Sequence, residues 1–262
     1  GRVCFSLCLS LSLSLSLSLC VCVCVFVLLG GMVFVFGYGS LVWKVDFPVV
    51  SRVEGYVRGF LRRFWQRDPV HRGVDGDEGL VVTLVSKEYC LENGVSVGED
   101  DITWGVAYEI DPAKEDEVLS HLDHRERAGY TKDTVEVYDS LHDEAHPILR
   151  DVLIFHGTPE NPYFTGPQPE ASTAAVIAHS KGASGTNCEY LFRLCDALRD
   201  IIRHQPSAHD PYLFRLERLV QEQLEGAADC SKSVAVPVDV ELQEEEEEEE
   251  KEEVSRGDRG QW

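Results

Sequence analysis

Short apolar runs rich in β-branched and aromatic residues fill much of the chain between residues 33 and 157, and this pattern limits the possible folds most strongly. Six runs have strand character and are separated by turn-forming residues, at 33–36, 53–64 (a strand with its continuation), 79–86, 103–110, 134–139 and 151–157. Helical spacing of apolar residues is confined to three segments, 111–127, 187–204 and 210–226. Strands mostly precede helices without strict alternation, which predicts an α+β domain with a mixed or closed sheet.

The first predicted helix has clear end signals. Asp111 is a natural N-cap, and Pro112 suits the first helical position. Gly129 follows the last turn and is expected to end the helix. Further along, the proline-rich segment 161–172, "NPYFTGPQPEAS", is predicted to be a loop.

The first 31 residues differ from the rest of the chain. They alternate Leu with Ser and then Cys with Val, and they carry no charge after Arg2. Such alternation is what CT and TG dinucleotide repeats encode. We therefore expect residues 1–31 to be a disordered, non-native leader translated from a simple repeat ahead of Met32, the only methionine. The alternative is a real hydrophobic leader or membrane anchor.

Charge is concentrated at the other end. From residue 239 to residue 262, twelve acidic residues stand against three basic ones, a net charge of −9 within the −22 of the whole chain. A run of seven glutamates repels itself and buries nothing, so residues 227–262 are predicted to be a disordered acidic tail. One domain is predicted over 32–226. The acidic balance speaks against nucleic acid as a partner, because phosphate binding needs clustered Lys and Arg.

Cysteine spacing gives no sign of a disulfide framework or a metal site. Outside the leader there are four cysteines, Cys90, Cys188, Cys195 and Cys230, with no CxxC pair and no His at metal-ligand spacing. This pattern favours free thiols in a reducing compartment, and we expect no metal.

The run "VFGYGS", residues 35–40, breaks from a strand into two glycines. Glycines in this position let backbone N–H groups face outward as an anion cradle, to which Ser40 adds a hydroxyl. The pattern is neither a Walker loop nor the GxGxxG dinucleotide fingerprint. Taken alone it is explained by a strand-end turn, and a carboxylate-sized anion is the ligand that would fit it.

Glu126 is the carboxylate whose position is most unusual. It follows Leu122 by four residues and Leu119 by seven, so a continuing helix would place it on the apolar stripe. Lost solvation there would raise its pKa and suit it to proton transfer near neutral pH. On periodicity alone, a solvent-facing or ion-paired Glu126 is the more ordinary interpretation.

Five blocks of sequence together resemble the ChaC family, the glutathione-specific γ-glutamylcyclotransferases. They are "VFGYGSLVWKVDFP", "RRFWQRDPVHRGVDGDEGLVVTLV", "WGVAYEI", "LDHRERAGY" and "GASGTNCEYLFRL". The resemblance runs in order from Met32 to about Gly226 and leaves out the leader and the tail. Members of the family begin with a methionine just ahead of the first block, which supports Met32 as the start.

The resemblance implies a cytoplasmic enzyme that cleaves glutathione into 5-oxoproline and cysteinylglycine without a metal, a nucleotide or another cofactor. It implies a small, barrel-like mixed β-sheet flanked by helices. Glutathione is the expected small-molecule partner, no nucleic-acid or membrane partner is expected, and the oligomeric state is left open.

The resemblance also assigns site residues. The catalytic glutamate of the family matches Glu126 in "RERAGY", where Arg127 and Ala128 depart mildly from the family's REKGGY-like pattern. The family's γ-glutamyl-binding loop matches six residues, Val35, Phe36, Gly37, Tyr38, Gly39 and Ser40. Further candidates are Leu41, Arg72, Glu117 and Tyr190, and Arg63 and His71 are considered with Arg72 for the glycyl carboxylate of glutathione. Salt bridges and core packing are equally ordinary roles for these further residues.

Two other functions remain open on the sequence. A cyclotransferase for other γ-glutamyl amino acids or amines would share Glu126 and the glycine loop. A non-catalytic interaction protein would instead work through its acidic tail.

Overall fold

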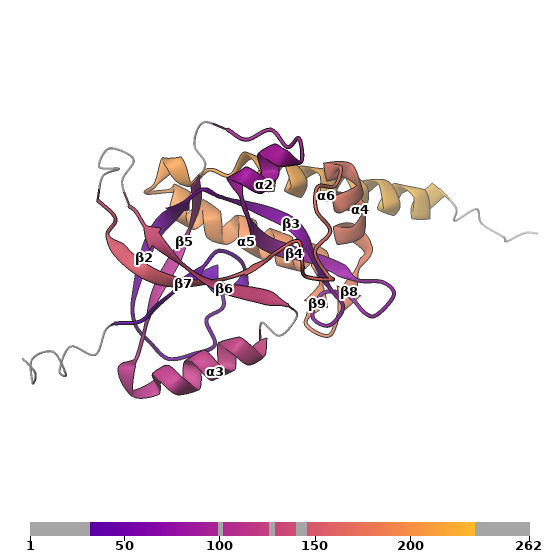
Figure 1. Ribbon diagram of the computed structural model, residues 1–262. Helices are drawn as coiled ribbons and strands as arrows, with labels where there is room; N and C mark the ends of the chain where they lie inside the picture. The colour runs from indigo at the N-terminus through magenta and orange to yellow at the C-terminus, as the bar shows by residue number, and fades with distance from the viewer. Residues whose placement is uncertain (1–31, 99–101, 126–128, 140–145, 234–262) are drawn as a thin grey trace, which may run out of the picture. The chain divides into compact units, whose positions relative to one another are not determined.

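The computed structural model of the chain describes residues 32–98, 102–125, 129–139 and 146–233. The strands are β1 (Phe34–Gly37), β2 (Val49–Arg58), β3 (Phe60–Asp68), β4 (Gly79–Ser86), β5 (Ile102–Ile110), β6 (Tyr130–Val137), β7 (Leu149–Gly157), β8 (Lys181–Gly182) and β9 (Gly185–Thr186). The α-helices are α2 (Lys87–Glu92), α3 (Glu115–Arg125), α4 (Glu170–His179), α5 (Asn187–Ile202) and α6 (Pro211–Ser233). Short 3₁₀ turns lie at η1 (Ser40–Val42), η2 (Pro112–Lys114) and η3 (Pro206–Ala208). Figure 1 shows how the strands and α-helices are arranged.

The main sheet is mixed and has the strand order β2-β5-β1-β7-β6. Strand β1 lies in its middle, antiparallel to β5 and parallel to β7, while the other neighbouring pairs are antiparallel. A single antiparallel bridge between Tyr56 and Tyr138 joins the two edges of this sheet, with backbone N–H···O distances of 2.7 and 2.9 Å. The sheet thus approaches a barrel without closing into a continuous ladder, and the predicted α+β fold with a mixed sheet and helices is confirmed.

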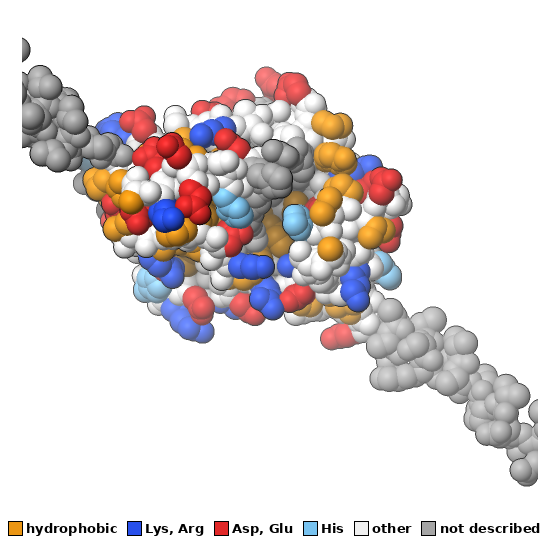
Figure 2. Space-filling view, turned by 90° about the horizontal axis from the view of Figure 1, so that it is seen from below, with side chains coloured by type: hydrophobic (Ala, Val, Ile, Leu, Met, Phe, Trp, Pro, Cys, Tyr) orange, Lys and Arg blue, Asp and Glu red, His pale blue; other side chains and the backbone are white. Residues whose placement is uncertain are grey.

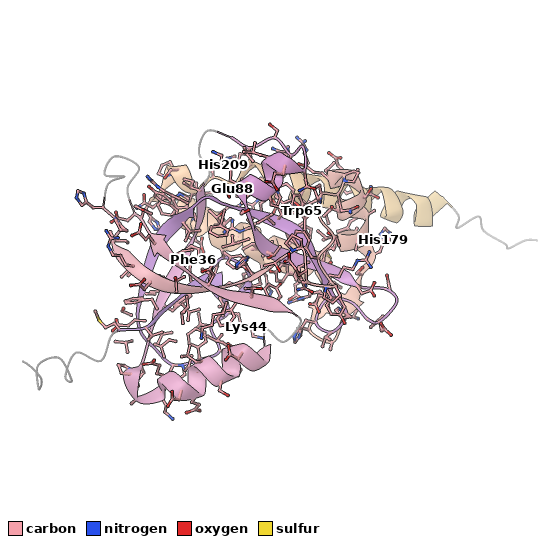
Figure 3. The ribbon with its side chains drawn as sticks, in the orientation of Figure 1. Phe36, Lys44, Trp65, Glu88, His179 and His209 are labelled. Carbon is pink, nitrogen blue, oxygen red and sulfur yellow. The ribbon has the colours of Figure 1, made fainter. Side chains whose placement is uncertain are left out.

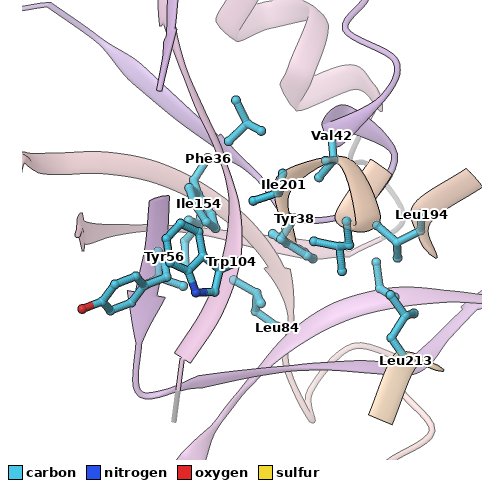
Figure 4. Close-up of a cluster of buried hydrophobic side chains, with 14 of the residues drawn as sticks. Phe36, Tyr38, Val42, Tyr56, Leu84, Trp104, Ile154, Leu194, Ile201 and Leu213 are labelled. Atoms are coloured by element: carbon cyan, nitrogen blue, oxygen red, sulfur yellow. The ribbon is translucent and has the colours of Figure 1, made fainter. Parts of the chain in front are cut away.

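A second layer is formed by the β3–β4 hairpin, and helix α5 packs against β4, α4 and η1. Side chains from both layers and from α5 and α6 share one hydrophobic cluster (Figure 4). Leu84 of β4, Ile154 of β7 and Leu194 of α5 each have no exposed side-chain surface in it. Burial of this apolar area is the main favourable term that holds the elements together.

Several element predictions hold and others are wrong. The segment 79–86 forms β4 with the predicted bounds, and Asp111 caps η2 by accepting a hydrogen bond from Ala113 N at 2.9 Å. The segment 53–64 was expected to be one strand with its continuation, but Gly59, at φ +72°, separates β2 from β3, which belong to different sheets. The predicted loop at 161–172 is wrong in its last three residues, because helix α4 begins at Glu170, just after the last proline.

The chain divides into two compact units, Gly1–Gln221 and Glu222–Trp262. Helix α6 does not end at Gly226 as expected but continues to Ser233. The leader and most of the acidic tail lie outside the described residues, so the domain limits stay predictions. No helix in the described ranges has both the length and the apolar character needed to cross a membrane.

Asn187 joins the first turn of α5 to strand β4. Its side chain is fully buried, and it donates to Leu80 O and accepts from Leu80 N, both at 2.7 Å. We expect Asn187→Ala to lower the free energy of unfolding by about 3 kcal/mol, because it leaves two buried backbone groups unpaired. Urea unfolding measures this change, and a loss below about 0.5 kcal/mol would contradict it.

Candidate functional site

The glycine loop, residues 37–41, connects the central strand β1 to the turn η1. The carbonyl oxygen of Gly39 accepts from Val42 N at 3.0 Å, and that of Ser40 accepts from Lys44 N at 2.9 Å. Phe36 before the loop and Lys44 after it are labelled in Figure 3. The chain therefore reverses direction directly at the end of a buried strand.

Both glycines of the loop are required by lack of space. A Cβ atom on Gly37 would lie 2.7 Å from the Cβ of Leu41, and one on Gly39 would lie 2.9 Å from both the hydroxyl of Tyr190 and a methyl group of Val82. Real Cβ atoms essentially never approach other atoms so closely. Close approach to neighbouring elements thus explains why the apolar run breaks into "GYG".

The loop is held from the core side by three side chains. The hydroxyl of Tyr38 donates to Phe155 O on β7, and the hydroxyl of Tyr108 on β5 donates to Leu41 O at 2.7 Å. Arg62 on β3 donates from Nε to Tyr38 O at 2.9 Å. Tyr38 itself is buried, as is Val42, in the core drawn in Figure 4. These contacts fix the carbonyl groups of the loop toward the protein interior.

Two backbone N–H groups of the loop, those of Gly39 and Leu41, have no acceptor within the described ranges. Both residues are partly exposed, whereas Phe36 and Tyr38 are buried. Because an unpaired N–H is costly unless water or a ligand satisfies it, this arrangement is suited to an anion or a polarised carbonyl oxygen.

Tyr190 adjoins the loop, and Arg72 lies against Tyr190. The Tyr190 ring meets Trp43 edge-on at 5.3 Å, and the guanidinium carbon of Arg72 lies 5.6 Å from the centre of the Tyr190 ring. Arg72 donates to Thr186 O at 2.9 Å and pairs with Glu189 at 3.3 Å, and 12% of its side chain is exposed. The structure therefore brings Tyr190 to the loop as a hydroxyl, and it places Arg72 against the Tyr190 ring.

A second contact leads from the loop toward the segment that follows α3. Val82, which limits the space at Gly39, has its carbonyl oxygen 3.5 Å from the hydroxyl of Tyr130. Gly129, just before Tyr130, has φ +85° and its carbonyl oxygen accepts from Asn161 Nδ2 at 2.9 Å. Tyr130, which follows Glu126 by four residues, thus contacts β4, the strand whose Val82 limits the space at Gly39.

Glu126 itself lies outside the described residues, so its catalytic role stays a prediction. Leu122, four residues earlier on α3, is fully buried as expected. Glu117 lies on the same helix, but 73% of its side chain is exposed and it pairs with Lys114 at 2.9 Å. It lines a surface hollow of about 450 Å³ with Phe47, Pro48 and His121, none of which belongs to the loop.

Arg63 and His71 have other partners. Arg63 donates to Arg62 O at 2.7 Å and lies over the Tyr212 ring, so it contributes to the core. His71 is exposed and its Nδ1 lies 3.1 Å from Ser184 Oγ. Neither contact joins these side chains to the glycine loop.

Two of the described thiols, Cys90 and Cys195, are poor candidates for a nucleophile. Cys90, Cys188 and Cys195 are free, and burial raises the pKa of Cys90 and of Cys195. Neither buried thiol is therefore a thiolate near neutral pH, which a nucleophile would need to be. Cys230 falls among side chains that the structure does not describe. Within the described ranges, no group of three or more His, Cys, Asp or Glu side chains is placed to hold a metal ion.

A hollow of about 530 Å³ adjoins η1 and is lined by Trp43, Arg52, Glu54 and one face of α5. Its charged groups are already paired, for example Arg52 with Glu54 at 3.0 Å. Figure 2 shows acidic and basic side chains interspersed over the face that it draws, with no continuous basic field. We find no charge there that calls for a ligand.

Two buried polar residues were not identified from the sequence: Arg62, which contacts the glycine loop, and Asn187, which joins α5 to β4. Arg62 has only 1% of its side chain exposed, but an arginine in a strand gives no sign of burial. Asn187 is the first residue of an apolar helix, where a polar side chain is common. Only the three-dimensional contacts distinguish them.

Comparison with known proteins gives a consistent result. A family model described as "ChaC: ChaC-like protein" matches residues 33–223. The chain is 39% identical to glutathione-specific γ-glutamylcyclotransferase 1 of Danio rerio, over 71% of this chain and 87% of that protein. It is 34% identical to the glutathione-specific γ-glutamylcyclotransferase of Schizosaccharomyces pombe, over 74% of this chain and 95% of that protein. A crystal structure of a yeast γ-glutamylcyclotransferase specific to glutathione matches with a TM-score of 0.62 and 33% identity, covering 74% of this chain and 100% of that one.

Proposed function

This chain belongs to the ChaC-like protein family, and on that basis we propose that it is a γ-glutamylcyclotransferase that cleaves glutathione into 5-oxoproline and cysteinylglycine. The single observation that carries the proposal is the family match over 33–223, which includes the glycine loop with its outward N–H groups. The predicted cytoplasmic location stays a prediction.

The reaction is an intramolecular acyl transfer. The α-amino nitrogen of the γ-glutamyl group attacks the carbonyl carbon of its own side-chain amide, a five-membered ring forms, and the bond to the cysteinyl nitrogen breaks. Holding the glutamyl chain folded back removes much of the entropic barrier to ring closure. The glycine loop supports this role because it offers fixed N–H donors beside the buried end of β1.

The chemistry requires a base because the α-amine is an ammonium near neutral pH and cannot attack. In the proposal, Glu126 takes a proton from this ammonium and later returns a proton to the departing cysteinyl nitrogen. The N–H groups of Gly39 and Leu41 stabilise the negative charge that develops on the carbonyl oxygen. Val35, Phe36, Gly37, Tyr38, Gly39 and Ser40 form the γ-glutamyl-binding loop, with Leu41, Arg72 and Tyr190 beside it. No nucleophilic side chain is needed, and Ser40 acts as a binder.

The direct test is incubation of purified protein with glutathione and with a panel of γ-glutamyl amino acids and amines. We expect 5-oxoproline and cysteinylglycine from glutathione, with kcat/KM at least about tenfold above that for the rest of the panel. Mass spectrometry of both products measures this. If only the γ-glutamyl amino acids or amines release 5-oxoproline, one of them and not glutathione is the substrate. If no compound releases 5-oxoproline, the proposal is wrong.

A further inference from the structure

Arg62 carries a positive charge into the core directly behind the glycine loop. Its Nε donates to Tyr38 O at 2.9 Å, its Nη2 donates to Trp104 O, and its Nη1 pairs with Asp210 Oδ2 at 3.0 Å. Only 1% of the side chain is exposed. A buried guanidinium is costly unless it is hydrogen-bonded and paired, and here each of its nitrogens has a partner.

The contact with Tyr38 O determines where the next N–H points. In a planar trans peptide, the carbonyl of one residue and the N–H of the following residue point in opposite directions. The described chain contains no cis peptide bond. Because Arg62 holds the Tyr38 carbonyl toward the core, the N–H of Gly39 points away from Arg62. That N–H has no acceptor in the described part of the chain, and Gly39 is partly exposed.

We propose that Arg62 is a positioning residue that fixes the Tyr38–Gly39 peptide so that the Gly39 N–H is aimed at the reacting carbonyl oxygen. The inference rests on the proposed function, because that function supplies the oxygen. The guanidinium also polarises this peptide, since hydrogen bonds in series strengthen one another in a low-dielectric interior. Arg62 thus acts on the substrate only through the backbone of the loop.

Asp210 holds the Arg62 guanidinium in position through an ion pair. Its Oδ1 accepts from Leu213 N at 3.1 Å at the start of α6, while its Oδ2 pairs with Arg62. Since 17% of the Asp210 side chain is exposed, the pair lies at the boundary of the core. The beginning of α6 is in this way linked to the Tyr38 carbonyl through one carboxylate and one guanidinium.

The test is Arg62→Lys, which keeps a charge but cannot reach three acceptors at once. We expect kcat for glutathione cleavage to fall by about tenfold to a hundredfold, since a misaligned oxyanion donor acts on the transition state. KM should change by less than about threefold. In protein labelled with [¹⁵N]glycine, the Gly39 amide resonance should shift.

The matched control is Arg199→Lys. Arg199 also pairs with a carboxylate in the fold, Glu217, whose side chain is 8% exposed, and it lies over the Phe214 ring. This control changes the same residue type on α5 without touching the glycine loop. We expect wild-type kcat and an unmoved Gly39 resonance, even if the variant unfolds at a lower temperature.

The outcomes separate the two claims. Wild-type protein that releases no 5-oxoproline overturns the proposed function, and with it the inference. If the wild type is active, then folded Arg62→Lys with wild-type kcat, or with an unmoved Gly39 resonance, overturns the inference alone. Should Arg62→Lys fail to fold, Asp210→Asn is the second variant. It should produce a smaller shift and a smaller loss of kcat, and a folded Asp210→Asn identical to wild type in both would contradict the inference.

Discussion

Replacing Glu126 by glutamine is expected to reduce 5-oxoproline release from glutathione by a factor of about 10² to 10⁴, while the protein remains folded. The amide has nearly the same shape as the carboxyl group but cannot accept the proton that blocks the α-amine. Product analysis under saturating glutathione measures the loss, and circular dichroism checks the fold.

Glu117→Gln is the matched control for this prediction. It makes the same change on helix α3, at a side chain that is 73% exposed and paired with Lys114. We expect activity within about twofold of wild type, because an exposed pair of this kind contributes little. The reverse result, an active Glu126→Gln with an inactive Glu117→Gln, would move the catalytic role to Glu117.

Replacing Gly39 by valine is expected to lower kcat/KM for glutathione by about a hundredfold or more. A Cβ atom there would lie 2.9 Å from both Tyr190 Oη and a Val82 methyl group, so either the loop with its N–H donor or these two side chains must shift. Loss of one such donor alone is typically worth about a hundredfold. Steady-state kinetics and titration with a non-cleavable γ-glutamyl analogue measure the effect.

Gly226→Ala provides the control for the glycine substitution. A Cβ atom on Gly226 meets nothing within 4 Å in helix α6, so this change should leave catalysis intact and stabilise the helix by up to about 1 kcal/mol.

Unchanged kcat/KM and unchanged analogue affinity in Gly39→Val would show that the loop does not bind the γ-glutamyl group.

The fold was predictable from the sequence where a local pattern and its end signals agree. Strand 79–86 begins at a glycine and ends at Ser86, which caps the next helix by accepting from Tyr89 N at 3.2 Å. Helix α5 has strong periodicity, and Leu191, Leu194 and Leu198 of the predicted stripe are all fully buried. In such segments local preference and tertiary packing favour the same structure.

The failures have physical causes as well. Nothing at Gly59 distinguishes a glycine within a strand from one at φ +72° that redirects the chain into another sheet. Helix α4 was missed because it follows a proline-rich loop and is capped by no side-chain hydrogen bond. The glycine loop could be proposed as a binding site from the sequence, and that role stays a prediction. The contact of Arg62 with the loop could not be predicted, because burial of a charge depends on acceptors from three distant segments.

The central place of β1 in the sheet has a consequence for the order in which the chain can fold. This strand is synthesised early, but its neighbours β5 and β7 end at Ile110 and Gly157. The hydroxyl of Tyr38 needs Phe155, and Arg62 needs Asp210. Most of the domain must therefore leave the ribosome before the glycine loop can reach its final geometry, because its contacts join residues that are distant in the sequence.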